Sequence, residues 1–153
     1  MKLGLAFSGG KDSLACLLMN KERLSEITVF WVNAGKNYPE TEKIVEFVKS
    51  ISPNFVEVRS NQQKQNNQNG LPADVVPVDW TVFGQTQTGN KPITIQPYIQ
   101  CCYENIAAPM MEAVKAYGIT HLIRGQRLDE SHKSTARNND EVNGIVFLHP
   151  IEE

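Results

Sequence analysis

The sequence has few cysteines, a small net charge and no long run of apolar residues. Only three cysteines occur among 153 residues, and Cys101 and Cys102 are adjacent, a poor geometry for a bond between them. A disulfide scaffold is therefore excluded, and a reducing, cytoplasmic location is expected. The apolar run Leu3–Phe7 stops at Ser8, so it is too short for a signal peptide or a membrane span.

The formal charge of −2 gives no overall basic field, so nucleic acid is not an expected partner. No group of His, Cys and Asp residues has the spacing of a zinc site, so no protein-bound metal is predicted. Cys16 and Trp31 lie in apolar surroundings and are expected in the core.

Short apolar runs alternate with helical patterns in the first third of the chain. Leu3–Phe7, Ile27–Val32 and Phe55–Val58 are typical of buried parallel strands. Helical spacing occurs at Leu14–Leu24 and from Tyr38 to about Ile51. This βαβαβ order predicts an α/β domain with a three-layer, mostly parallel, doubly wound sheet of about five strands. The apolar stripe of the second helix is expected to face inward at Ile44, Val45, Phe47, Val48 and Ile51.

The middle of the chain breaks this order. Residues 60–70 contain no apolar side chain and predict a flexible polar loop. Residues 71–97 contain four prolines and predict an irregular insert with a short helix near Val78–Phe83. Helical spacing returns at Gln100–Tyr117, before Gly118. Further short strands are expected at 121–123 and 144–148.

The most informative motif lies between the first strand and the first helix, at Ser8–Ser13, with the sequence SGGKDS. Two glycines allow a sharp turn that brings backbone N–H groups close to an anion. The helix start adds unpaired N–H groups and the positive end of the helix dipole. Lys11 adds a charge, while Asp12 would serve as a helix cap or a metal-bridging carboxylate. The motif has neither P-loop nor Rossmann spacing, so it predicts a different kind of phosphate loop.

The Ser8–Ser13 motif resembles the pyrophosphate-binding loop of the ATP pyrophosphatase superfamily, whose fold is adenine nucleotide alpha hydrolase-like. Within that superfamily, three further segments resemble phosphoadenylyl-sulfate (PAPS) reductases. They are Asn33-Ala34-Gly35 with Tyr38-Pro39-Glu40-Thr41, Cys101-Cys102 with Pro109-Met110, and Gly125-Gln126-Arg127 with Glu130-Ser131 and Arg137. The first of these usually reads Asp-Thr-Gly in the family, so Asn33 and Ala34 depart from the pattern.

The resemblance implies one nucleotide-binding domain over residues 1–153, with an adenine nucleotide (PAPS, APS or ATP) across the strand ends. Lys11, Arg127 and Arg137 would act on the anionic groups, and Cys101 and Cys102 are the candidate catalytic thiols. An iron–sulfur cluster normally needs four thiolates, so none is expected in a single chain with three cysteines, and no tightly bound cofactor is predicted. The implied nucleotide-binding residues are Ser8, Gly9, Gly10, Lys11, Asp12, Ser13, Asn33, Ala34, Gly35, Gly125 and Arg127.

Three functions remain open at this point. The first is an oxidoreductase of sulfur metabolism, in which a thiolate attacks a sulfonucleotide and a thioredoxin-like reductant then releases sulfite, leaving an adenosine bisphosphate. The family carries this thiol in a C-terminal Glu-Cys-Gly-Leu-His tail, which this sequence does not contain, so a lost tail, another chain or Cys101/Cys102 would supply it. The second is an ATP pyrophosphatase that cleaves ATP between its α and β phosphates with Mg²⁺. The third is a non-catalytic adenine-nucleotide-binding module. A homodimer is compatible with each of these three functions.

The segment around and after Gly125 is rich in basic residues. Arg124, Arg127, Lys133 and Arg137 lie within fourteen positions, beside His132. Guanidinium groups bind phosphate and sulfate oxygens in a bidentate manner, so this segment is expected to complete the anion site.

Overall fold

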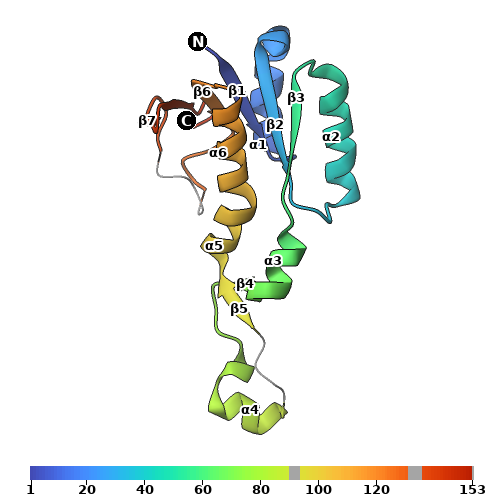
Figure 1. Ribbon diagram of the computed structural model, residues 1–153, viewed down its shortest axis with the longest axis vertical. Coiled ribbons are helices and arrows are strands. Elements are labelled where there is room, and N and C mark those ends of the chain that lie inside the picture. The colour runs from blue at the N-terminus through green and yellow to red at the C-terminus, as the bar shows by residue number, and fades with distance from the viewer. Residues whose placement is uncertain (90–93, 131–135, 153) are drawn as a thin grey trace.

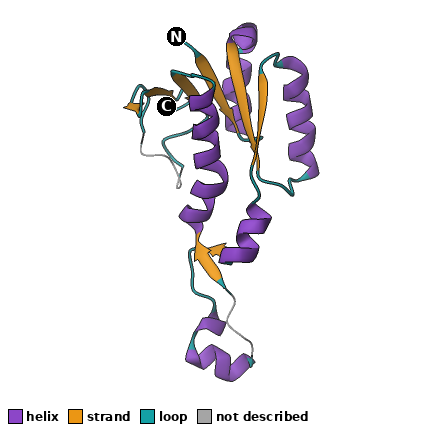
Figure 2. Ribbon diagram, in the orientation of Figure 1, coloured by secondary structure: helices purple, strands orange, loops and turns teal. Residues whose placement is uncertain are grey.

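The computed structural model describes residues 1–89, 94–130 and 136–152. A six-stranded sheet with the order β3-β2-β1-β6-β8-β7 lies at its centre (Figure 2). Five strands are parallel, and β7 pairs antiparallel with β8 at one edge. The predicted doubly wound sheet is therefore confirmed, with β7 as an additional short strand. The strands are β1 (Leu3–Phe7), β2 (Ile27–Asn33), β3 (Phe55–Arg59), β6 (His121–Arg124), β7 (Glu141–Val142) and β8 (Ile145–Leu148).

Helices cover both faces of the sheet and make three layers (Figure 1). α1 (Lys11–Met19) and α2 (Pro39–Ile51) contribute to one buried cluster, and α6 (Ala108–Ala116) contributes to the other. Successive strand residues face opposite sides, so Val29 joins the first cluster and Phe30 joins the second. Among the described residues, no helix is both long and apolar enough to cross a membrane.

The two predicted helices of the first third differ in detail from expectation. α1 ends at Met19, and a 3₁₀ helix, η1 (Lys21–Glu26), continues to β2. In α2, Val45 and Val48 are buried, but the prediction that Phe47 faces inward is wrong, because its side chain is half exposed.

Residues 62–69 form a helix, α3 (Gln62–Asn69), so the prediction of a flexible loop at 60–70 is wrong. The Asn61 side chain accepts a hydrogen bond from the Lys64 N–H and caps its start. Gly70, with φ of +95°, ends it. The helix buries no residue, and its amide side chains hold it in place. Glutamine also has a high helix propensity, which does not depend on an apolar face.

Residues 71–89 and 94–97 leave the sheet and form a projection, which we call the arm (Figure 1). Its base is a two-stranded parallel sheet of β4 (Leu71–Ala73) and β5 (Ile95–Pro97). Its tip contains a short 3₁₀ helix, η2 (Val78–Trp80), and α4 (Val82–Thr88), so the insert is more regular than predicted.

A continuous helical segment returns from the arm to the sheet. It comprises α5 (Tyr98–Cys102), a π-helical turn, η3 (Tyr103–Ala107), and α6. Pro109 has no N–H to donate to the carbonyl of Asn105 in the preceding turn. The Ser60 hydroxyl donates to that carbonyl instead, at 2.6 Å, and so links the end of β3 to the π turn.

Candidate functional site

The site lies between β1 and β6, where the order in which successive strands are added to the sheet reverses. β1 pairs with β2 on one side and with β6 on the other, so the segments after β1 and β6 leave adjacent strand ends. Open α/β sheets bind ligands in the crevice at such a switch point. The Ser8–Ser13 motif follows β1, and Gly125 follows β6.

The two serines of the motif shape the loop. The Ser8 N–H donates to Ser13 Oγ at 3.2 Å, and the two hydroxyl oxygens lie 3.0 Å apart. Ser13 Oγ also donates to the Gly10 carbonyl at 2.9 Å, and its side chain is buried. These contacts fold the chain after Phe7 into a closed turn that leads directly into α1.

The concave side of this turn carries unpaired donors. α1 begins at Lys11, and Leu14 makes the first bond back to the Gly10 carbonyl. Within the described chain, the N–H groups of Lys11, Asp12 and Ser13 have no acceptor, as expected for the first turn of a helix. The exposed Lys11 side chain adds a positive charge to the helix dipole. The turn can therefore hold an anionic oxygen.

Glycine is required at two points of the site, at Gly125 because of a close backbone and at Gly9 because of a positive φ and a close threonine side chain. A methyl group at Gly125 would lie 2.5 Å from the carbonyl carbon of Asp12 and 2.6 Å from the nitrogen of Ser13. A methyl group at Gly9, whose φ is +82°, would lie 2.8 Å from Cγ2 of Thr41 in α2. Gly10 has an ordinary φ of −88° and more room, 3.4 Å to Ser8 Oγ.

Arg127 reaches the first turn of α1. Its Nε lies 3.7 Å from Asp12 Oδ2 and 3.4 Å from Asp129 Oδ1. Asp12 therefore pairs with a cation, and the prediction that it caps α1 is wrong, since Gly10 occupies the cap position without a side-chain bond. The charges of Lys11 and Arg127 are formally balanced by the two carboxylates.

The segment after β2 is ordered by Asn33. Its Oδ1 accepts from the Gly35 N–H at 3.0 Å and from Asn37 Nδ2 at 2.9 Å, while its Nδ2 donates to Glu57 Oε1 at 2.9 Å. The bond from Asn33, with smaller contributions from Arg59 and Lys49, lowers the pKa of Glu57. Because β2 is the neighbour of β1, the turn through Ala34 lies beside the phosphate loop.

Arg137 lies in a different environment from Arg127. Its Nη1 is 3.6 Å from Glu152 Oε1, and its N–H donates to Asp140 Oδ2 at 2.7 Å. None of its described contacts joins it to the loop. The other basic candidates of this segment, His132 and Lys133, lie outside the described residues.

The cysteine pair lies at the same end of the sheet but away from the loop. Cys101 is buried in α5, where Gln62 Nε2 donates to its Sγ at 3.4 Å, and Cys102 is partly exposed. Gln62 follows β3, two strands from β1, and none of the described contacts of Cys101 joins it to the loop. Cys16 is in the core as predicted, and burial, reinforced by Asp12, raises its pKa to about 11.

The sequence reasoning missed a buried amide cluster between α3, β5 and the π turn. Gln96 Nε2 donates to Gln65 Oε1 at 3.0 Å, Asn66 Oδ1 at 3.1 Å and the Gly70 carbonyl at 2.7 Å. Asn105 Nδ2 donates to Gln65 Oε1 at 3.1 Å. The sequence feature that corresponds to this cluster is the amide-rich composition of residues 61–70. Taken alone, that composition indicated a loop. This cluster fixes the base of the arm against the helix.

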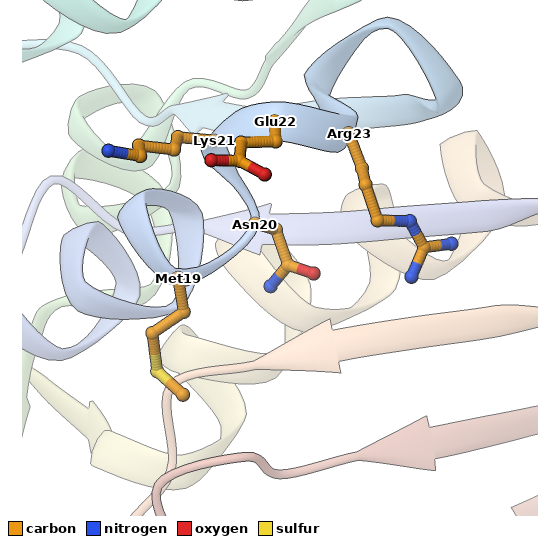
Figure 3. A pocket seen from close by; sticks show the side chains of 5 residues that line it. All are labelled: Met19, Asn20, Lys21, Glu22 and Arg23. Atoms are coloured by element: carbon orange, nitrogen blue, oxygen red, sulfur yellow. The ribbon is translucent and has the colours of Figure 1, made fainter.

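A surface cavity of about 290 Å³ lies elsewhere, at the opposite end of α1 (Figure 3). It is lined by Met19, Asn20, Lys21, Glu22 and Arg23 around the turn between α1 and η1. Asn20 Nδ2 donates to the Cys16 carbonyl, and Arg23 pairs with Glu26 at 3.3 Å. The cavity contains none of the candidate residues, so it is separate from the phosphate loop.

Comparison with known proteins agrees with this geometry. The family model of the phosphoadenosine phosphosulfate reductase domain matches residues 2–144. Among solved structures, the chain is similar to phosphoadenylyl-sulfate (PAPS) reductase from Candida auris in its phosphate complex, with 16% identity and a TM-score of 0.61. The match covers 99% of this chain but 66% of that one, and it bears on the fold alone. No curated protein matches the chain.

Proposed function

The chain belongs to the phosphoadenosine phosphosulfate reductase domain family, and from this premise we propose that it binds a sulfonucleotide and reduces it to sulfite and an adenosine phosphate. The observation that carries the proposal is that the free N–H groups at the start of α1 lie beside Arg127 at the switch point of the sheet. These groups suit the sulfate or phosphate end of the nucleotide.

The charge of the site favours a sulfonucleotide over free ATP. Lys11 and Arg127 attract anionic oxygens, but Asp12 and Asp129 offset their charge. A sulfuryl group carries less negative charge than the β and γ phosphates of ATP, so it requires less compensation. The adenosine would extend along the strand ends toward the turn at Asn33–Gly35, which lies beside the loop.

The reaction requires a thiolate and a second thiol. The thiolate attacks the sulfuryl sulfur, an S–S bond forms, and the S–O bond to the phosphate breaks as the adenosine phosphate leaves with the electron pair. The second thiol then attacks the thiol-derived sulfur, which releases sulfite and leaves a disulfide. A dithiol protein of the thioredoxin type supplies both electrons. Lys11 and Arg127 would stabilise the charge that develops on the departing phosphate.

The attacking thiolate is proposed to come from outside the three cysteines of this chain. Cys16 and Cys101 are buried, and Cys102 has no described contact with the loop. The reductant or another chain would then provide the nucleophile, while this chain binds and orients the nucleotide.

Sulfite release from purified protein with PAPS or APS and a thioredoxin-like dithiol tests the proposal. We expect sulfite to form, Lys11→Ala and Arg127→Ala to reduce its rate, and Cys102→Ser to leave it unchanged. Lys21→Ala, at the separate cavity, is the matched control for removal of a lysine. Pyrophosphate release from ATP instead of sulfite would contradict the proposal, and nucleotide binding without any product would favour a non-catalytic module.

A further inference from the structure

The arginines of this chain differ in whether a carboxylate balances their charge. Four of the five form an ion pair, and these pairs are Arg23–Glu26, Arg59–Glu57, Arg127–Asp12 and Arg137–Glu152. The fifth is Arg124, the last residue of β6, and within the described ranges 1–89, 94–130 and 136–152 it pairs with no carboxylate. Charged groups that are withdrawn from water are normally paired, so Arg124 is a candidate for binding an anionic ligand.

The surroundings of Arg124 withdraw its side chain from water without neutralising it. The guanidinium lies over the Phe147 ring of β8, 5.8 Å from the ring centre. Burial lowers the pKa of this guanidinium, against the opposing charge of Glu130, whose Oε1 accepts from the Arg127 N–H instead. Among the residues that the structure describes, none accepts a hydrogen bond from the guanidinium of Arg124. The aromatic contact therefore holds a cation whose N–H donors are available to a ligand.

Arg124 lies beside the phosphate loop, on the side away from the turn proposed for the adenosine. It is the register partner of Ala6 in β1, two residues before the loop begins. The next residue, Gly125, touches the start of α1, where an added methyl group would lie 2.5 Å from a backbone carbon. The turn at Asn33–Gly35 follows β2, on the other side of β1. A nucleotide that runs from this turn past the loop therefore ends at β6.

We propose that Arg124 binds the sulfuryl group and so distinguishes a sulfonucleotide from the same nucleotide without sulfur; this inference rests on the function proposed above. The loop N–H groups and Arg127 hold the 5′-phosphate, and the sulfuryl group extends from that phosphate away from the ribose, toward β6. A guanidinium donates to two oxygens of such a group in a bidentate manner. Because no carboxylate engages Arg124, binding the sulfuryl group breaks no ion pair. Arg124 and Arg127 thus bind adjacent groups of one ligand.

Pairs of nucleotides that differ only in the sulfuryl group test this assignment. Isothermal titration without a reductant measures the affinities for PAPS and adenosine 3′,5′-bisphosphate, and those for APS and AMP. Arg124→Met keeps a long side chain over Phe147 but removes the charge and the donors. It should lower the ratio of the two affinities in each pair about tenfold or more, and change the affinity for AMP less than about twofold. The control Arg23→Met removes an arginine that is paired with Glu26 beyond the opposite end of α1, and should leave both ratios unchanged.

A second variant keeps the test decisive if loss of the charge impairs folding. Arg124→Lys retains a cation but not the planar pair of donors, so it should fold as the wild type does and lower each ratio several-fold. Unchanged ratios in both Arg124 variants would overturn the assignment. Equal losses for both members of each pair would also overturn it, because they would show a general attraction for anions. A wild type that binds none of the four nucleotides would contradict the proposed function itself, and this inference with it.

Discussion

The phosphate loop and the arm both extend from the carboxyl edge of the sheet, but their shapes have different origins. The loop lies between β1, α1 and β6, with Leu5 and Leu17 buried behind it. The arm has no buried side chain at its tip and is attached through the amide cluster around Gln96. The comparison teaches that the loop has a buried core behind its serine hydrogen bonds, whereas the arm depends mainly on directional hydrogen bonds.

The largest expected effect is at Gly125, where the loop backbone leaves no room for a side chain. Gly125→Ala should lower the free energy of unfolding by about 3 kcal/mol or more and weaken nucleotide binding, because the added methyl group would displace Asp12 and Ser13. Gly89→Ala in the arm is the control, since its φ of +66° is strained but an added methyl group would meet no atom of the described residues within 4 Å apart from its chain neighbours, and it should cost about 1 kcal/mol. Urea unfolding measures both. Equal losses of unfolding free energy in the two variants would contradict the close contact at the loop.

The next effect concerns the attachment of the arm. Gln96→Ala removes four hydrogen bonds, three donated by Nε2 and one accepted by Oε1 from Gln65, and leaves the Gly70 carbonyl without its side-chain donor, which should cost about 2–3 kcal/mol. Hydrogen exchange should accelerate in α3 and β5 but not in β1. Gln85→Ala, on the exposed side of α4, is the matched control and should leave exchange unchanged. Uniform acceleration across the chain would show that the arm and the sheet unfold together.

A comparison of two arginines tests the composition of the loop site. Arg127→Ala should weaken nucleotide binding about tenfold or more, because its guanidinium lies beside the first turn of α1. Arg137→Ala should change the affinity less than about twofold, because its described partners are Asp140 and Glu152. Isothermal titration with adenosine 3′,5′-bisphosphate measures both. Equal losses of affinity in the two variants would indicate that Arg137 belongs to the site, as the family resemblance predicted.

The smallest effect is a pH dependence that originates outside both regions. The buried His149 side chain has a pKa lowered from 6.5, chiefly by desolvation and against the opposing charge of Glu152. Its neutral form is favoured in the folded state, so this stabilisation is complete above pH 6.5 and declines as the pH falls toward the folded pKa. The melting temperature should therefore fall by a few degrees between pH 7.5 and 5.5, and less so in His149→Gln. Glu57, with its pKa lowered from 4.5, stays ionised in this range.

The fold could be predicted wherever apolar periodicity reports burial. β1, β2 and β3 follow apolar runs, and α2 buries Val45 and Val48 as its spacing indicates. The pattern cannot distinguish a shallow position from a deep one, and for this reason Phe47 was placed incorrectly. β7 has two exposed residues and exists only through its pairing with β8, so no local pattern could indicate it.

The candidate site was predictable in its backbone and less so in its side chains. The order strand, Gly-Gly, helix located the loop, because that geometry depends on local conformation. The pairing of Asp12 with Arg127 joins residues 115 positions apart, and helix α3 depends on Gln96 in β5 and Glu104 in η3. Contacts of this kind between distant polar residues carry no periodic signal.

The unbroken run from Tyr98 to Ala116 has a mechanical consequence. It is about 28 Å long, with one end at the base of the arm and the other packed through Val114 against the sheet (Figure 1). A force applied at the arm would therefore be transmitted through this helical run to the part of the sheet at β2 and β3 on which α6 packs. The phosphate loop does not lie on this path.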